Sequence, residues 1–365
     1  MKRLLSQPPV SAPADQVAAV LPHVRRIEDF VSRAVVSESL AQAIAAPHLA
    51  GPLALRQLAL DVSTQLRPRL ERASEVYERQ MAQDTLLKTG ARLLDEALGG
   101  GVATGEVTEL IGPPLAGKSQ LAMAMCAQQL ASTSSRVLFV DTCCGFRAER
   151  VYQMMGTVAH KMTREQRKER LGQLLVRCAT SLLALLEVVD QLSSELAAGG
   201  GGGMRLFVID SVYSALIGDH TNISCSATGA QVARLQQSLR RLASYHRLAV
   251  VLINSAIPVS SSRDAVLSGS SQAPLPQQVV GCHQQFWRAA LGQQWLHTAD
   301  VRIALRPDPD ASPELFPIPH LLSIIKCSLS ERNIATADDC ISLTITSRGV
   351  HAEMRSTQRT LDFRC

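Results

Sequence analysis

The sequence predicts an α/β protein: a core with a mostly parallel central sheet and a phosphate-binding loop, preceded by a small helical N-terminal domain. After residue 90, short apolar runs of strand length alternate with helical patterns, which is typical of β-α-β units and a parallel sheet. The segment GPPLAGKS at residues 112–119 follows one of these runs and opens a helix. Together these observations predict a core that binds phosphate groups.

The chain has 365 residues, enough for one sizeable core and a smaller companion domain. Residues 21–70 carry Ala, Leu and Val at helical spacing, interrupted by prolines, so we expect a helical domain over residues 1–70. Residues 71–89 are rich in charge and glutamine and predict a linker that contains a solvated helix. Residues 90–365 form the predicted core.

Apolar runs of strand length recur through this core. They lie at residues 107–111, 137–140, 206–209, 249–253, 301–305, 321–325 and 341–345. Helical stripes of Leu and Val occupy residues 185–196 and 232–246 between them. Two longer segments, residues 217–230 and 256–285, fit neither pattern. Both follow strands, so they emerge at the edge of the sheet where α/β proteins bind ligands.

Composition narrows the class of protein. Hydrophobic residues make up 46% of the chain and charged residues 19%, which predicts a folded protein. The net charge of +5 permits contact with a polyanion, while an aromatic content of 4% argues against recognition by base stacking. The nine cysteines are odd in number and never form C-x-x-C, which argues against a disulfide framework or a zinc site. No run is apolar enough for a signal peptide or membrane span, so we expect a soluble protein of the reducing cell interior.

Residues 112–119 match the P-loop pattern G-x-x-x-x-G-K-[ST] in the required position between a strand and a helix. The predicted nucleotide-binding residues are Gly112, Pro113, Pro114, Leu115, Ala116, Gly117, Lys118, Ser119 and Gln120. In such a loop the backbone N–H groups surround the β-phosphate, Lys118 reaches the β- and γ-phosphates, and the Ser119 hydroxyl ligates Mg²⁺. Leu115 stands where many such loops have glycine, which predicts some loss of conformational freedom.

Asp210 ends the apolar run RLFVID and is the second predicted metal residue, in the manner of a Walker B aspartate. Asp141 ends another such run, VLFVD, between the P-loop and Asp210 in the sequence. We expect the strand of Asp141 to be inserted between the P-loop strand and the Asp210 strand. That order is the one in which a separate carboxylate activates water for hydrolysis.

The chain resembles the RecA-type recombinases, and specifically the eukaryotic Rad51 paralogues. The matching stretches are LLDEALGGGVATGEVTELIGPPLAGKSQ, VLFVDTCCGFRAERV, LFVIDS, VVLINS and AALGQQWLHTADVRIAL, which together span most of residues 89–305. The stretches DEALGGGVA, ELIGPP and AALGQQW look most like the B paralogue, while TGEVTE is also similar to the D paralogue. The resemblance implies a RecA-like P-loop NTPase core. In that family, the loops that map to residues 217–230 and 256–285 face DNA.

Two departures from the family pattern concern hydrolysis. Active members have a glutamate that positions the attacking water where this chain has Cys143, and a glutamine that senses the γ-phosphate where it has Ser255. A neutral thiol replaces a carboxylate poorly at neutral pH. Alternatively, Cys143 and Cys144 form a redox pair, although the nearest basic residue is Arg147 and thiolate activation requires a closer positive charge.

The resemblance implies ATP and Mg²⁺ as cofactors and a nuclear location. It implies assembly with other recombinase paralogues, the C-type first among them, and contact with single-stranded or branched DNA. The expected function is that of a mediator of DNA strand exchange in homologous recombination and double-strand break repair, with weak DNA-dependent ATPase activity of the RecA type. The alternative is a non-catalytic RecA-fold scaffold for partner proteins. A P-loop phosphotransferase is disfavoured, because residues 256–288 offer only Arg263 and Arg288 for an arginine-bearing lid.

Overall fold

The computed structural model describes residues 70–199, 202–218, 226–259, 279–282, 285–291, 295, 297–308, 319–327, 341–346 and 349–354. The chain divides into two compact units, residues 1–79 and 80–365. Most of the first unit, including the predicted helical domain up to residue 69, lies outside the described residues, so that domain stays a prediction. Helix α6 (Ala73–Gln83) lies in the predicted linker and has no buried residue, as expected of a solvated helix.

The described part of the second unit contains an eleven-stranded sheet and a separate pair of short strands. The helices are α7 (Arg92–Ala97), α8 (Lys118–Ser132), α9 (Ala148–Val158), α10 (Arg164–Leu171), α11 (Leu182–Ala197), α12 (Val212–Gly218) and α13 (Ser226–His246). The strands are β1 (Leu86–Leu87), β2 (Val102–Ala103), β3 (Val107–Gly112), β4 (Arg136–Asp141), β5 (Leu174–Cys178), β6 (Met204–Asp210), β7 (Ala249–Val259), β8 (Val279–Cys282), β9 (Gln285–Ala289), β10 (Val301–Pro307), β11 (Pro319–Cys327), β12 (Ile341–Thr346) and β13 (Gly349–Met354). Strands β1 and β2 form the separate antiparallel pair.

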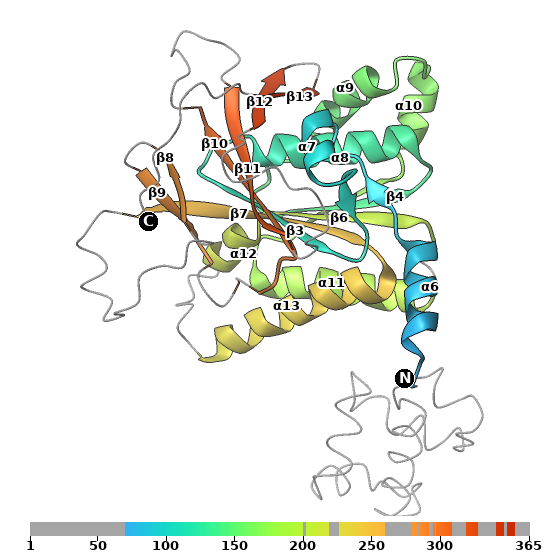
Figure 1. Ribbon diagram of the computed structural model, residues 1–365. Coiled ribbons are helices and arrows are strands. Elements are labelled where there is room, and N and C mark those ends of the chain that lie inside the picture. Colours follow the sequence, from blue (N-terminus) through green and yellow to red (C-terminus); the bar gives the residue numbers. More distant parts are fainter. Residues whose placement is uncertain are drawn as a thin grey trace, which may run out of the picture. The chain divides into compact units, whose positions relative to one another are not determined.

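The main sheet has the order β13-β12-β11-β10-β3-β7-β6-β4-β5. The strands from β10 to β5 pair in parallel, whereas β10 to β13 pair antiparallel. Helices cover both faces, with α8 and α9 on one and α11, α12 and α13 on the other (Figure 1). Each face has its own apolar core, and strands β3, β4, β6 and β7 contribute alternate residues to the two. The fold is therefore RecA-like, with a mostly parallel sheet, as the sequence predicts.

Every predicted apolar run forms a strand, namely β3, β4, β6, β7, β10, β11 and β12. The predicted strand order is wrong in one respect. The strand inserted between the P-loop strand β3 and the Asp210 strand β6 is β7, and β4 lies on the far side of β6. The β7 sequence is buried and strongly apolar from Ala249 to Ile253, so it suits a central position as well as β4 does. Sequence order alone could not distinguish the two.

The described residues of the two segments without a predicted element lie in helices and strands. In the first, α12 continues to Gly218 and α13 begins at Ser226, which leaves residues 219–225 outside the described residues. In the second, β7 continues to Val259 and β8 pairs with β9, which pairs back onto β7. The sequence pattern thus gave no sign of the start of α13 in the first segment or of the β-hairpin that extends from the carboxyl end of β7 in the second.

Candidate nucleotide-binding site

The loop over residues 112–117 leaves the carboxyl end of β3 and enters α8 at Lys118. Two glycines allow the neighbouring strands to approach it closely. A Cβ atom on Gly112 would lie 2.2 Å from the backbone oxygen of Leu305, and one on Gly117 would lie 2.4 Å from Cδ1 of Ile345. Gly117 also has φ +85°, a left-handed conformation that glycine adopts without strain. The loop is thus held between β10 and β12 with its N–H groups at the start of a helix.

Leu115 stands at the tip of this loop in a left-handed conformation, with φ +65°. Its side chain is 94% exposed, and its backbone oxygen lies 3.0 Å from Nε2 of His320 on β11. His320 is buried, and its Nδ1 has no hydrogen-bond partner. Sequence reasoning missed His320, because nothing in the residues around it indicates that β11 lies against the loop.

Lys118 is 9% exposed, and its Nζ donates hydrogen bonds of 2.8 Å to the oxygen of Gly112 and 2.7 Å to that of Pro113. The ammonium group therefore binds backbone carbonyls of its own loop, and the loop surrounds it. Burial lowers the pKa of Lys118 to about 8, although the nearby charge of Asp210 opposes this shift. A phosphate ligand would replace these neutral carbonyl partners with negatively charged oxygens.

Asp210 and Ser119 come together at the carboxyl end of β6, where their side chains form a hydrogen bond. Burial raises the pKa of Asp210, and Asp141 adds to this effect, while Ser119 and Lys118 oppose it. A hydroxyl and a carboxylate beside a buried ammonium form a set of hard oxygen donors of the kind that Mg²⁺ uses together with phosphate oxygens. Among the described residues, no group of three or more His, Cys, Asp or Glu side chains forms a metal cage. The residues thus fit a metal held jointly with a phosphorylated ligand.

The loop after β4 carries Cys143 and is tied to the end of β6. The carboxylate of Asp141 accepts hydrogen bonds from the N–H groups of Cys143 (2.9 Å) and Phe146 (2.8 Å). The hydroxyl of Thr142 donates to the oxygen of Ser211 (2.8 Å) and accepts from its N–H (2.7 Å). Asp141 is thus occupied in shaping the loop. Glu149, the next candidate carboxylate, is exposed in the first turn of α9.

Ser255 lies on β7 directly beside Gly112, its partner in the parallel register of β3 and β7. The structure therefore places position 255, where the family resemblance predicts a γ-phosphate sensor, next to the first residue of the loop. Gln120 belongs to the first turn of α8, and its Oε1 accepts a 2.8 Å hydrogen bond from Nε of Arg150 on α9. The Gln120 side chain is thus engaged by α9 and not by the loop.

A buried polar network lies in the sheet beneath the loop. Glu109 on β3 accepts a 2.6 Å hydrogen bond from Nε of Arg302 on β10 and a 2.7 Å hydrogen bond from Nδ2 of Asn254 on β7. The exposed fractions are 0%, 1% and 0% for Glu109, Arg302 and Asn254. One carboxylate thus links the P-loop strand to the strands on either side of it.

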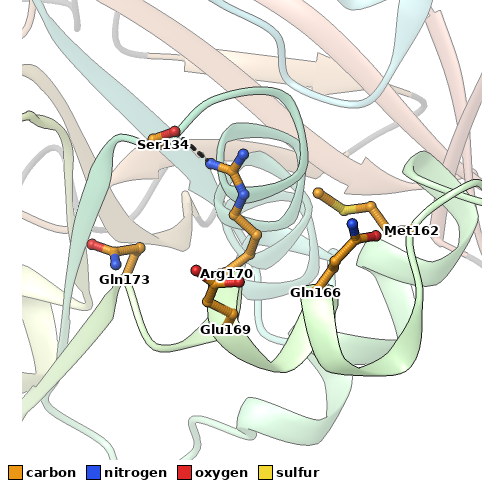
Figure 2. Close-up of a pocket in the computed structure, with 6 residues that line it drawn as sticks. All are labelled: Ser134, Met162, Gln166, Glu169, Arg170 and Gln173. Carbon is orange, nitrogen blue, oxygen red and sulfur yellow. Dashed lines mark hydrogen bonds between the residues drawn. The ribbon is translucent and has the colours of Figure 1, made fainter.

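Away from the P-loop there is a pocket of about 340 Å³. Figure 2 shows the residues that line it, namely Ser134, Met162, Gln166, Glu169, Arg170 and Gln173. Arg170 on α10 donates to the hydroxyl of Ser134 (2.8 Å) and to the oxygen of Thr133 (2.7 Å). Ser134 and Gln173 precede the parallel strands β4 and β5, so this pocket lies at the amino ends of the strands. It is therefore at the opposite edge of the sheet from the P-loop.

The parallel sheet, the P-loop at the end of one strand and the acid at the end of a strand two places away define a RecA-like P-loop fold. The chain belongs to the Rad51 family, whose family model matches residues 80–302. It is 28% identical over 259 residues to the Arabidopsis thaliana protein named DNA repair protein RAD51 homolog 2, covering 67% of this chain and 68% of that protein. It is 30% identical over 142 residues to the Mus musculus protein named DNA repair protein RAD51 homolog 4, covering 38% of this chain and 43% of that protein.

A solved structure supports the fold. The RadB recombinase aligns with a TM-score of 0.52 and 21% identity, covering 73% of this chain and 99% of that chain. In the part of the chain that the structure describes, every helix is too short or too polar to traverse a lipid bilayer.

Proposed function

We propose that this chain binds ATP with Mg²⁺ at the P-loop and assists DNA strand exchange during recombinational repair, as a mediator within a complex of Rad51 paralogues. The observation that carries the proposal is the buried ammonium of Lys118, which lies between the loop carbonyls and the Asp210 carboxylate. A buried charge of this kind at the start of a helix is suited to a phosphate. Membership of the Rad51 family, with relatives named DNA repair proteins, supports the wider role.

In this proposal the loop N–H groups and Lys118 bind the phosphates. On binding, Lys118 exchanges its hydrogen bonds to Gly112 and Pro113 for phosphate oxygens, so that its positive charge gains a counter-charge. Ser119 and Asp210 would hold Mg²⁺, which neutralises part of the phosphate charge when bound. Burial raises the pKa of Asp210, while the hydrogen bond from Ser119 and the charge of Lys118 favour the carboxylate anion that this role needs.

Hydrolysis by the isolated chain is expected to be slow. Phosphoryl transfer depends on positioning the attacking water and on stabilising charge. Cys143 offers no carboxylate to orient water, and the Asp141 carboxylate already accepts two backbone hydrogen bonds. Ser255 lies beside Gly112, but its side chain is shorter than the expected glutamine. Nucleotide occupancy would then control assembly more than it drives turnover.

The finer assignments rest on the family resemblance. We propose the B type as the paralogue class, because DEALGGGVA, ELIGPP and AALGQQW resemble it most, and the C-type paralogue as the first partner to test. Contact with single-stranded or branched DNA would use the segments after α12 and β7, and the site of action would be the nucleus. Arg240 on α13 is a poor candidate for DNA contact, because it donates to the oxygen of His297 and pairs with Asp300.

A non-catalytic scaffold is the second candidate, and the thiol at position 143 and the serine at position 255 favour it. The two proposals differ in whether ATP binds at all. Equilibrium binding of labelled ATP with Mg²⁺ decides between them, with the wild-type chain compared with Lys118→Ala and with Lys168→Ala, which removes an exposed lysine from α10. We expect loss of binding in Lys118→Ala alone. Equal affinity in all three proteins would exclude the phosphate site.

A further inference from the structure

Two cysteines far apart in the sequence meet at the ends of neighbouring strands. Cys178 is the last residue of β5 and pairs in register with Asp141, the last residue of β4. Cys144 lies in the loop that follows β4, where its left-handed conformation (φ +56°) turns it towards β5. The two Sγ atoms are 3.7 Å apart, and both residues are exposed.

We propose that Cys144 and Cys178 are a site of reversible oxidation, at which hydrogen peroxide forms a disulfide. A disulfide requires an S–S distance of about 2.05 Å, so the sulfur atoms must approach by about 1.7 Å. Because both side chains are exposed, rotation about their χ1 angles can supply this movement without displacing the apolar core. The β4–β5 pairing ends with Asp141 beside Cys178, and Cys144 follows Asp141 by three residues, so the backbone brings the two groups close together.

The chemistry needs only peroxide as oxidant. One thiolate attacks an oxygen of hydrogen peroxide, the O–O bond breaks, and a sulfenic acid forms while hydroxide leaves and is protonated to water. The second thiolate then attacks the sulfenic sulfur, an S–S bond forms, and a second hydroxide leaves as water. Two thiols and one peroxide thus yield one disulfide and two waters. A dithiol reductant reverses the reaction by thiol–disulfide exchange.

The same geometry favours this pair over the adjacent pair, Cys143 and Cys144, considered from the sequence. The Cys143 sulfur lies 3.6 Å from the hydroxyl of Thr142, whereas the Cys144 sulfur faces Cys178. The hydrogen bond to Cys144 raises the pKa of Cys178, and either thiolate can make the first attack on peroxide. Cys126 is fully buried on α8, and burial raises its pKa, so it serves as an internal unreactive thiol.

The disulfide would fasten the loop that carries Cys143 to the edge strand β5. The Thr142 hydroxyl already binds the backbone of Ser211 after β6. After oxidation, the loop beside the proposed nucleotide site would therefore be held by Ser211 on one side and by Cys178 on the other. The disulfide would close a loop between two cysteines that are 34 positions apart in the sequence and so favour the folded state. Formation of the bond is independent of the proposed ATP binding, and only its effect on nucleotide rests on that function.

The test uses the full-length chain, fully reduced and then treated with hydrogen peroxide, alkylated and digested with trypsin without reduction. Cleavage after Arg136, Arg147, Arg177 and Arg205 places Cys143 and Cys144 together in one peptide and Cys178 in another. We expect these two peptides to be joined in the wild type and in Cys143→Ser, and separate in Cys144→Ser and Cys178→Ser. Joining that survives in Cys144→Ser, or a link to any other cysteine or between two chains, would overturn the assignment.

A second readout does not depend on peptide mapping. Peroxide is expected to raise the thermal unfolding midpoint of the wild type and of Cys143→Ser, and dithiothreitol to reverse the rise. Cys144→Ser and Cys178→Ser, both exposed and therefore expected to fold, should show no rise. Equal behaviour of all four proteins, with only sulfinic acids found at positions 144 and 178, would refute the proposal. ATP binding by reduced protein tests the proposed function separately.

Discussion

Removing the Glu109 carboxylate is expected to weaken the core beneath the P-loop severely. Glu109→Ala leaves Arg302 charged and buried, and deprives Asn254 of its hydrogen bond. Breaking a buried ion pair from one side costs about 3–5 kcal/mol. At about 2–4 °C per kcal/mol for a core of this size, the unfolding midpoint should fall by roughly 6–20 °C. Thermal unfolding followed by circular dichroism measures this shift.

A matched control is Glu96→Ala, which removes the carboxylate of an exposed pair. Arg92 and Glu96 are one helical turn apart on α7, with side chains 82% and 56% exposed. An exposed pair of this kind contributes about 0.3–0.5 kcal/mol, so the midpoint should barely move. The double variant Glu109→Leu/Arg302→Met should recover part of the lost stability, because no charge is left unpaired. If Glu109→Ala unfolds no earlier than Glu96→Ala, the network does not hold the three strands together.

Three further predictions concern the proposed site. Because the pKa of Lys118 is about 8 without nucleotide and a bound phosphate would raise it, ATP binding should take up a proton at alkaline pH. The affinity measured by isothermal titration should then fall about tenfold from pH 7 to pH 9, and an affinity that does not change with pH would contradict this role of Lys118. His320→Phe removes the contact to the Leu115 oxygen. ATP binding should weaken about fivefold, which corresponds to the net free energy of one hydrogen bond. An unchanged affinity would show that this contact does not contribute to ATP binding. Deleting residues 260–278 should reduce salt-dependent DNA binding in filter assays and spare ATP binding; loss of ATP affinity instead would assign the segment to the nucleotide site.

The P-loop could be predicted because its residues are contiguous and its strand–loop–helix context can be recognised in the sequence. The contacts that surround it could not. Glu109, Asn254 and Arg302 meet only because β3 lies between β7 and β10, and strand order in an α/β sheet does not follow sequence order. The same reason explains the incorrect placement of β4.

His320 and Cys178 were missed on similar grounds. His320 lies on β11, which pairs antiparallel with β10. Its contact with the Leu115 oxygen of the P-loop exists only because of this pairing. Cys178 ends β5, a partly exposed edge strand with no long apolar run, so the sequence did not predict the strand at all. Side chains that depend on neighbours across a sheet become visible only when the register is known.

The central claim is that the chain binds ATP and lacks the means to hydrolyse it quickly. The direct test measures ATP turnover and ATP affinity on the same samples. The proteins compared are the wild type, Cys143→Glu and Cys143→Glu/Ser255→Gln. We expect all three to bind ATP. Turnover should be slow in the wild type, faster with Cys143→Glu, whose carboxylate can orient water, and faster again when the glutamine contact is added. If the wild type already turns over ATP as fast as the double variant, the account of Cys143 is wrong and another carboxylate, with Glu149 as the first candidate, performs this role.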